Sequence, residues 1–565
     1  MIIGIDLGTT NSLAAYFTEK GPKMIPNRLG KHLTPSVVSV DEQNQIYVGE
    51  TALERSYLYP AWSASVFKRS MGSGKKYLLG DREFTAEELS SFVLRSLKED
   101  AEVYLGETVE EAIISVPAYF DDKRRKATKR AGEMAGLKVE RIISEPTAAA
   151  IAYGLYERRE NTKFLVFDLG GGTFDVSVLE LFDSILEVRA VAGDNYLGGE
   201  DFSRLLADRF IEKKGLEISG LDEKTLRNIE KQAEKCKLDF ADSSEAEMCC
   251  VINGAEESLT ITLKEYEKMC EPLLAKIRRP VQRSLSDAHV KLADIDKIVL
   301  VGGATRLSVV RDFIIRMFRK FPDTGMNPDE AVALGAAIQG AMKERQEAVR
   351  EVILTDVCAF TLGTEISVKL ENGSVEDGHF CPIIERNTVI PASRTERFFT
   401  VHDNQEHVRI QVLQGESRYA DNNLLLGELD ILVPPNKAGQ ESVDVTYTYD
   451  INSILEVEVC VNSTRKKTRQ IIKNRENEMT DEEIEERMRE LSYLKIHPRE
   501  QEENKLLLLR GERLYEETTG DMRRRMEYEI QKFEMVLNTR DRGRIEEAAR
   551  NFARVMREVE EDSEL

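Results

Sequence analysis

The stretch KFLVFDLGGGTFDVSVLEL, residues 163–181, contains two apolar runs that predict β-strands, with three glycines between them. Glycine stabilises a strand poorly, so its place between two well-formed strands needs a reason other than stability. The stretch IIGIDLGTTNSLAAYF, residues 2–17, has the same order of parts: an apolar strand, Asp-Leu-Gly, small residues and a second strand. The two stretches therefore indicate an internal duplication, in which Asp6 and Asp168 each end a buried strand.

The chemistry of these two turns favours a phosphate site. Glycine lets backbone N–H groups approach an anion closely, and threonine hydroxyls add uncharged donors, so two facing hairpins could hold a polyphosphate from both sides. Aspartates repel phosphate, and their natural partner at such a site is Mg²⁺, directly or through water. A third strand, KIVLVGGATRL at 297–307, ends in paired glycines followed by Arg306, whose guanidinium suits stacking on a base. One glycine hairpin alone is more often a simple turn, whereas three in matching context favour a nucleotide site.

Composition limits the remaining possibilities. The chain has 565 residues, which predicts three or four domains. Its net charge of -22 argues against nucleic acid or a membrane surface as the main partner. We find no apolar run near the ~18 residues of a membrane span and no signal segment, so we expect a cytoplasmic protein. The seven cysteines show no metal-binding spacing and are expected to be reduced structural thiols.

The pattern changes along the chain. Residues 1–348 alternate apolar strands with amphipathic helices, which predicts an α/β domain. Residues 349–356 form a short apolar linker, and 357–473 alternate apolar and polar residues, which predicts an antiparallel β-sandwich. Residues 474–565 predict a small helical unit, because TDEEIEERMREL at 480–491 begins with a capping-box spacing and continues with a helical apolar period.

Several motifs, in this order, resemble the ATPase domain of DnaK-type 70-kDa heat-shock chaperones: GIDLGTTNS, VPAYFDDKRR, SEPTAAAIAYG, FDLGGGTFDVSV, GDNYLGGEDF, LVGGATRL and NPDEAVALGAA. The resemblance continues through VILTD and VLQGE and covers more than four-fifths of the chain. It implies a multidomain protein with an actin-like α/β ATPase domain of duplicated ribonuclease-H-like lobes, an antiparallel β-sandwich and a short α-helical lid. It also implies ATP or ADP as the nucleotide, Mg²⁺ as cofactor with K⁺ as a further candidate, and a role in protein folding and the stress response.

The resemblance also assigns residues to the nucleotide site. Lys68 would contact the γ-phosphate and orient the attacking water, Glu145 would help to position that water, and Asp6 and Asp168 would hold the water shell of Mg²⁺. Leu238 stands where some relatives carry an adenine-stacking arginine. The full predicted set is Lys68, Glu145, Asp168, Asp6 and Thr173 for catalysis, and Gly8, Thr9, Thr10, Asn11, Gly170, Gly171, Gly172, Gly198, Gly199, Glu234, Lys237, Gly302, Gly303, Arg306 and Asp329 for nucleotide binding.

In the sandwich, the resemblance implies a groove for extended apolar polypeptides. Without the resemblance, alternating apolar residues of this kind would be interpreted as core. The positions that match the groove are Leu362, Thr364, Ser367, Phe398, Thr400, Val401, Val408, Ile410 and Ile454. The positions that match the family's coupling or J-domain contacts are Pro117, Arg125, Arg141, Val352, Ile353, Leu354 and Asp356.

The apolar linker suits a role in coupling. Burying its three apolar residues at about 1.5 to 3 kcal/mol each gives roughly 4 to 8 kcal/mol as an upper value. Reversing a two-state equilibrium needs about 5.5 kcal/mol, so docking of the linker is large enough to act as a switch. The alternative is that Val352 to Leu354 form an edge strand of the sandwich.

Two departures from DnaK indicate a subtype. The helical tail is shorter than a full lid, and VINGAEESLTIT at 251–262 lacks the long hairpin that DnaK offers to its exchange factor. The chain is therefore most similar to the short-lid bacterial HscC subgroup, which implies few client polypeptides, a dedicated J-domain partner and nucleotide release without GrpE.

Two other functions stay open at this point. A small-molecule kinase on the same actin-like fold would explain the phosphate hairpins but not the linker, sandwich and tail. A nucleotide-gated binding scaffold would hold ATP without hydrolysing it, although Lys68, Glu145 and both aspartates are present. Transfer of phosphate to a small acceptor would indicate the kinase, and a phosphate-release assay would separate the scaffold from an ATPase.

Overall fold

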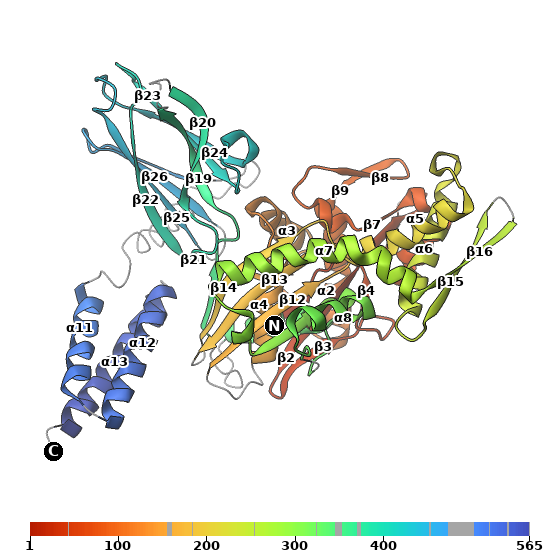
Figure 1. Ribbon diagram of the computed structural model, residues 1–565, viewed down its shortest axis with the longest axis horizontal. Helices are drawn as coiled ribbons and strands as arrows, with labels where there is room; N and C mark the ends of the chain where they lie inside the picture. Colours follow the sequence, from red (N-terminus) through yellow and green to blue (C-terminus); the bar gives the residue numbers. More distant parts are fainter. Residues whose placement is uncertain are drawn as a thin grey trace. The chain divides into compact units, whose positions relative to one another are not determined.

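The computed structural model describes residues 1–42, 45–154, 161–182, 185–252, 255–323, 325–344, 353–369, 375–450, 454–472, 502–518, 520–539 and 542–563 (Figure 1). The chain divides into two compact units, Met1–Ile353 (unit 1) and Leu354–Leu565 (unit 2). Among the described residues, no helix is both long enough and apolar enough to cross a membrane.

The first sheet of unit 1 is built around the first glycine hairpin. Its strand order is β11-β10-β1-β2-β3, and β4 also pairs with β2. Strands β1, β10 and β11 are parallel, whereas β1, β2 and β3 are antiparallel. The bounds are β1 (Ile2–Asp6), β2 (Asn11–Thr18), β3 (Gly21–Ile25), β4 (Thr34–Pro35), β10 (Glu111–Val116) and β11 (Ile142–Ser144).

The second sheet repeats this arrangement around the second hairpin. β12 and β13 are antiparallel and joined by the three glycines, β14 continues the meander, and β17 lies parallel to β12 as β10 does to β1. The bounds are β12 (Asn161–Leu169), β13 (Phe174–Phe182), β14 (Ile185–Asp194) and β17 (Lys297–Val301). The matching strand pairings confirm the duplicated α/β fold.

Two helices rich in alanine and glycine join the halves of unit 1. α4 (Glu145–Gly154) follows β11, and α9 (Ala331–Lys343) packs on both α4 and β1. A Cβ on Gly335 would lie 1.8 Å from the carbonyl oxygen of Ala148, and one on Gly4 would lie 2.1 Å from the backbone nitrogen of Ala337. The small residues are therefore required because the backbones meet directly.

The other elements of unit 1 surround the two sheets. Capping boxes at Thr85 and Thr262, each with a glutamate three residues later, begin two of the helices. The helices are α1 (Glu50–Leu58), α2 (Ala86–Leu105), α3 (Asp122–Met134), α5 (Gly199–Lys214), α6 (Glu223–Asp239), α7 (Leu263–Asp287) and α8 (Ser308–Phe318). The remaining strands are β5 (Val37–Val40), β6 (Ile46–Val48), β7 (Ser63–Ser65), β8 (Lys76–Leu79), β9 (Arg82–Thr85), β15 (Glu245–Ile252) and β16 (Ala255–Thr262).

Unit 2 contains the predicted antiparallel sandwich. Its sheets have the orders β20-β19-β23-β24 and β22-β25-β26-β27, and apolar side chains from both form one core. The bounds are β19 (Leu362–Lys369), β20 (Val375–Ile384), β22 (Ala392–Phe399), β23 (His407–Gln414), β24 (Leu424–Leu432), β25 (Ser442–Tyr449), β26 (Leu455–Val461) and β27 (Lys467–Ile471).

The end of the predicted linker forms a strand. β18 (Ile353–Val357) pairs through Asp356 and Val357 with β21 (Val389–Ile390). Val352 lies outside the described residues, as do the side chains of Ile353 and Leu354.

Three helices follow the sandwich: α11 (Glu502–Glu517), α12 (Gly520–Thr539) and α13 (Arg542–Ser563). They pack on one another around Phe533 and Phe552, whose ring centroids are 5.1 Å apart. The helical tail is confirmed for these residues. The capping-box segment 480–491 lies outside the described residues, and the proposed domain limits at 348 and 473 remain predictions.

Candidate functional site

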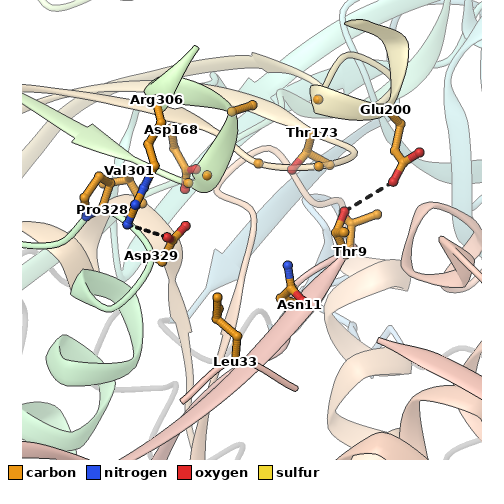
Figure 2. Close-up of a pocket in the computed structure, with 18 of the residues that line it drawn as sticks. Thr9, Asn11, Leu33, Asp168, Thr173, Glu200, Val301, Arg306, Pro328 and Asp329 are labelled. Atoms are coloured by element: carbon orange, nitrogen blue, oxygen red, sulfur yellow. Dashed lines mark hydrogen bonds and ion pairs between the residues drawn. The ribbon is translucent and has the colours of Figure 1, made fainter. Parts of the chain in front are cut away.

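The two glycine hairpins of unit 1 face a cavity of about 540 Å³. Thr9 and Asn11 of the first hairpin and Asp168 and Thr173 of the second lie on different sides of it (Figure 2). Every residue predicted for catalysis or nucleotide binding lines this cavity except Gly172 and Gly198. The residues that the sequence predicts for catalysis and nucleotide binding therefore lie around one cavity.

Gly172 and Gly198 lie behind the wall of the cavity, where they allow close packing. A Cβ on Gly198 would lie 2.5 Å from the backbone of Gly171, and one on Gly172 would lie 2.5 Å from the Thr9 side chain. Gly302 has φ 82, in the left-handed region that favours glycine, and its Cβ would meet the Leu169 carbonyl at 2.5 Å. These glycines fix the positions of the backbone that surrounds the cavity.

Replacing Gly198 by alanine is expected to weaken ATP binding at least tenfold. Backbone atoms cannot yield to a Cβ at 2.5 Å, so the 170–173 turn must move, and loss of one or two hydrogen bonds to phosphate costs about 1.5 to 3 kcal/mol each. Isothermal titration of ATP would measure the change. Gly220→Ala is the matched control, since no atom lies within 4 Å of its added Cβ; equal affinities for the two variants would contradict the prediction.

Lys68 and Glu145 form a buried ion pair at the cavity. Lys68 Nζ donates to Glu145 Oε1 at 2.6 Å, and the side chains are only 3% and 9% exposed. Lys68 lies in the turn η2 (Phe67–Ser70), and Glu145 begins α4. Val66, just before the turn, has φ 57, which is rare and costly for a β-branched residue. The backbone is thus strained where it presents the lysine.

Three buried carboxyl groups lie close together beside this pair. Asp6 Oδ1 accepts from Ser115 Oγ at 2.9 Å, whereas Asp168 Oδ2 has no hydrogen-bond partner among the described residues. Burial raises the pKa of Asp6 to about 7, and the nearby Glu145 carboxylate adds to the rise. The same two causes raise the pKa of Asp168 well above its ordinary value and that of Asp175 to about 8.

This carboxyl cluster fits a cation held through water. A partnerless buried oxygen and pKa values raised by burial and by the Glu145 carboxylate, despite the nearby Lys68, indicate that further positive charge would stabilise the ionised cluster. The described residues contain no group of three or more side chains set to hold a metal directly. Asp6 and Asp168 would therefore hold Mg²⁺ by its water shell, and the ion would offset phosphate charge when bound.

Without a divalent cation, unit 1 is expected to lose stability as the pH rises from about 4 to about 7. A carboxyl group whose pKa is raised by folding binds protons more tightly in the folded state, so its deprotonation favours unfolding. For Asp6, a rise from 3.8 to about 7 corresponds to a loss on the order of 4 kcal/mol. Thermal unfolding of wild type and Asp6→Asn across this range, each with and without Mg²⁺, measures the difference. The variant should show a shallower slope, as should wild type with Mg²⁺; parallel curves would contradict the assignment.

The opposite side of the cavity suits a nucleoside. Arg306 forms an ion pair with Asp329 at 2.7 Å, and Lys237 forms one with Glu234 at 2.6 Å. The dashed line at Asp329 in Figure 2 marks the first pair. Lys237 Nζ also donates to the Gly199 carbonyl at 3.3 Å. Leu238 lines the same cavity and is 59% exposed, so the lining offers an apolar side chain as well as the Arg306 guanidinium. The pairs place donors and acceptors where a ribose and base could contact them.

Sequence reasoning missed several residues of the site. Arg69 donates from Nε to the Gly172 carbonyl at 2.8 Å and from Nη2 to Asp201 at 2.7 Å, and so ties the Lys68 turn to the second hairpin. Glu200 accepts from Thr10 Oγ1 at 3.5 Å across the cavity, and burial raises its pKa. Asp175 is the cross-strand partner of Asp168, a signal present in FDLGGGTFD that could have identified it.

Of the predicted coupling residues, Pro117 belongs to a turn that contacts Asp175, and Arg125 donates to that turn. Arg125 donates to the carbonyls of Phe120 and Ala118, in the turn where the Phe120 N–H donates to the Pro117 carbonyl. The same turn brings the backbone N–H of Tyr119 to Asp175 Oδ1 at 3.3 Å. The structure thus joins Pro117 and Arg125 to the carboxyl cluster. It places Arg141 just before β11, part-buried, and Asp356 beside the Val357 N–H at 2.8 Å.

The predicted groove residues differ in exposure. Leu362 and Ile410 belong to the core of the sandwich, and Thr364 and Thr400 are also buried. Phe398 and Val408 are partly buried against that core, whereas Val401 is 37% exposed. Ser367 donates to Asp377 at 2.6 Å, and Ile454 is part-buried. Their role in peptide binding remains a prediction.

Comparison with known proteins gives a consistent result. A family model described as Hsp70 protein matches residues 2–78 and 75–564. Chaperone protein DnaK of Thermotoga neapolitana is 42% identical over 471 residues, which cover 81% of this chain and 77% of the relative. DnaK of Thermotoga maritima gives the same values. DnaK of Thermosipho africanus is 39% identical over 497 residues, which cover 86% of this chain and 81% of the relative.

Proposed function

The chain belongs to the Hsp70 family as a DnaK-like, ATP-dependent chaperone and ATPase, and from this premise we propose how its own residues bind and hydrolyse ATP. ATP would occupy the 540 Å³ cavity, with its phosphates between the two glycine hairpins. The observation that carries this proposal is the buried Lys68–Glu145 pair, because it sets a cation and a carboxylate beside those hairpins.

In the proposed reaction the chain positions groups rather than forming a covalent intermediate. Lys68 would contact the γ-phosphate and the attacking water, and Glu145 would hold the lysine and orient that water. Threonine hydroxyls of both hairpins would bind the phosphates: Thr9, Thr10 and Thr173. Phosphoryl transfer depends mainly on such positioning and on stabilisation of charge, which fits this set of residues.

The nucleoside would lie toward Arg306. Its base would stack between the Arg306 guanidinium and the Leu238 side chain, and Glu234 and Lys237 would contact the ribose. Gly302 and Gly303 would let the backbone approach the nucleoside closely. The exposed Leu238 and the Arg306–Asp329 ion pair support this orientation.

We further propose that the sandwich binds extended apolar segments of client polypeptides and that the linker couples this binding to ATP. Recognition would use main-chain hydrogen bonds and side-chain pockets of one β-sheet edge. The route from the carboxyl cluster through Tyr119 to Pro117 and Arg125 supports coupling at the nucleotide end.

The partner, the compartment and the subgroup of this chain are proposed from fewer observations than the nucleotide site. We propose a J-domain partner and a cytoplasmic compartment, the latter supported by seven cysteines that are all free thiols. We also propose the HscC subgroup, on the sequence grounds of the short helical tail and the VINGAEESLTIT segment; the strands of this region, β15 and β16, are eight residues each. Nucleotide release that GrpE does not accelerate would support this assignment, and strong acceleration would contradict it.

The proposed function is tested by phosphate release with and without an unfolded peptide. Turnover stimulated by peptide is the expected result, whereas no release of phosphate would contradict the ATPase and leave the nucleotide-gated scaffold and the kinase. Transfer of phosphate to a sugar or carboxylate acceptor would favour the kinase alternative, which the family match over residues 2–564 argues against.

A further inference from the structure

A second concave surface of unit 1 lies between α7 and α8, and it shares no residue with the nucleotide cavity. Its volume is about 690 Å³. The floor is apolar and is made by Leu274 of α7 and by Val309, Phe313 and Met317 of α8. The first three of these side chains are buried in the core that supports the groove, so the floor is part of the folded scaffold.

The rim of this groove carries charged side chains that form no ion pairs with other described residues, although Arg316 Nε donates to the Asp312 carbonyl at 3.2 Å. Lys264, Lys268, Arg278 and Arg316 are exposed, and they outnumber the two carboxylates of the rim, Glu267 and Glu271. None of the six forms an ion pair with another described residue. Lys264 and Glu267 are three residues apart on α7, as are Lys268 and Glu271, and opposite charges at this spacing stabilise a helix. Arg278 has no carboxylate three or four residues away on α7, so its charge is not balanced in this way.

We propose that the α7–α8 groove binds an amphipathic, acidic helix of a partner protein. The rim from Lys264 to Arg278 extends about 21 Å along α7, the length of a helix of about 14 residues. An apolar stripe on the partner would cover Met317, the least buried residue of the floor, and the edges of Phe313 and Leu274 that line the groove, as in other helix-in-groove complexes. Acidic residues beside that stripe would face the basic rim, whose surplus of two positive charges stands out on a chain of net charge -22.

Two other occupants fit the groove less well. An oligonucleotide would bring phosphates toward Glu267 and Glu271 and would leave the apolar floor without a complementary surface. An extended client segment needs a free sheet edge for main-chain hydrogen bonds, and both walls of this groove are helices whose backbones are already bonded. The proposal is independent of ATP turnover, because no residue of the groove lines the nucleotide cavity.

Fluorescence anisotropy of the full-length chain with a labelled, stapled helical peptide tests this proposal. The peptide would be about 14 residues long, with leucine on one face and glutamate beside it. Lys268→Glu/Arg278→Glu is expected to weaken binding at least tenfold. Lys276→Glu/Arg279→Glu, which reverses exposed charges elsewhere on α7, should bind as wild type does. Basal ATP turnover should be unchanged in both variants.

A charge swap in both the peptide and the protein gives the clearest test of charge complementarity. A peptide with lysine in place of glutamate should bind the Lys268→Glu/Arg278→Glu variant better than it binds wild type. The proposal is overturned if all variants bind the acidic peptide equally, or if an unlabelled extended client peptide displaces it. It is also overturned if a single-stranded oligonucleotide binds with the same dependence on Lys268 and Arg278.

Discussion

Lys68→Ala is expected to lower the turnover number for ATP at least 100-fold while ATP still binds. Removing one preorganised group that stabilises transition-state charge typically costs about 10² to 10³ in rate. Lys68 is 3% exposed and lies 2.6 Å from Glu145, so no other side chain or bulk water can replace its charge in place. The phosphates would still meet both glycine hairpins, which is why binding should persist. Single-turnover hydrolysis and ATP titration measure the two quantities separately.

A double substitution separates catalysis from folding in this experiment. Lys68→Ala leaves Glu145 buried without its partner, and breaking a buried pair in this way costs about 3 to 5 kcal/mol. Lys68→Met/Glu145→Gln removes both charges and keeps the volumes, so it should unfold near the wild-type temperature and yet fail to turn over ATP. Lys75→Ala, at an exposed lysine, is the neutral control. Recovery of turnover together with stability would show that Lys68 has only a structural role.

Leu354→Ser combined with Asp356→Asn is expected to abolish the stimulation of ATP turnover by peptide and to leave basal turnover unchanged. Removing a leucine that the docked linker would bury takes about 1.5 to 3 kcal/mol from a switch that needs about 5.5 kcal/mol. That change alone shifts the balance of the two states by more than tenfold. Phosphate release at saturating peptide, divided by release without peptide, should fall to about one.

A surface leucine provides the comparison for the linker variant. Leu432 in β24 is 58% exposed, so Leu432→Ser should retain the full stimulation. If the linker variant were stimulated as strongly as wild type, coupling through residues 352–356 would be excluded. A loss of stimulation together with basal turnover would indicate damage to the ATPase unit instead.

The sequence predicts the parts of this site that are local. Asp6 and Asp168 each end a strand before glycine, and this pattern is visible in the order of residues alone. Arg69 is different, because its contacts with Gly172 and Asp201 join residues more than a hundred positions apart. The positive φ of Val66 could not be predicted from the neighbouring sequence either, since valine ordinarily favours extended backbone.

Burial in the sandwich shows the same limit. The alternating pattern predicts which residues share a face of a strand, but both faces of β26 are buried here, including Glu456. The core position of Leu362 follows from how two sheets meet, which the period of one strand does not determine, whereas Val401 is exposed in the connection beyond the end of β22.

The crossing of α4 and α9 has a consequence for how fast the nucleotide cavity of the ATPase unit can open and close. At the contact between Gly335 and Ala148, neither residue has a side-chain rotamer to change. A small shift of α4 relative to α9 therefore meets little resistance from side chains at this contact. Resistance to opening then comes from two polar contacts beside the nucleotide cavity: the Arg69–Asp201 ion pair and the hydrogen bond that Thr10 donates to Glu200. The lifetime of bound nucleotide would accordingly depend on these polar contacts, and substitutions at them would change it while leaving the α4–α9 contact intact.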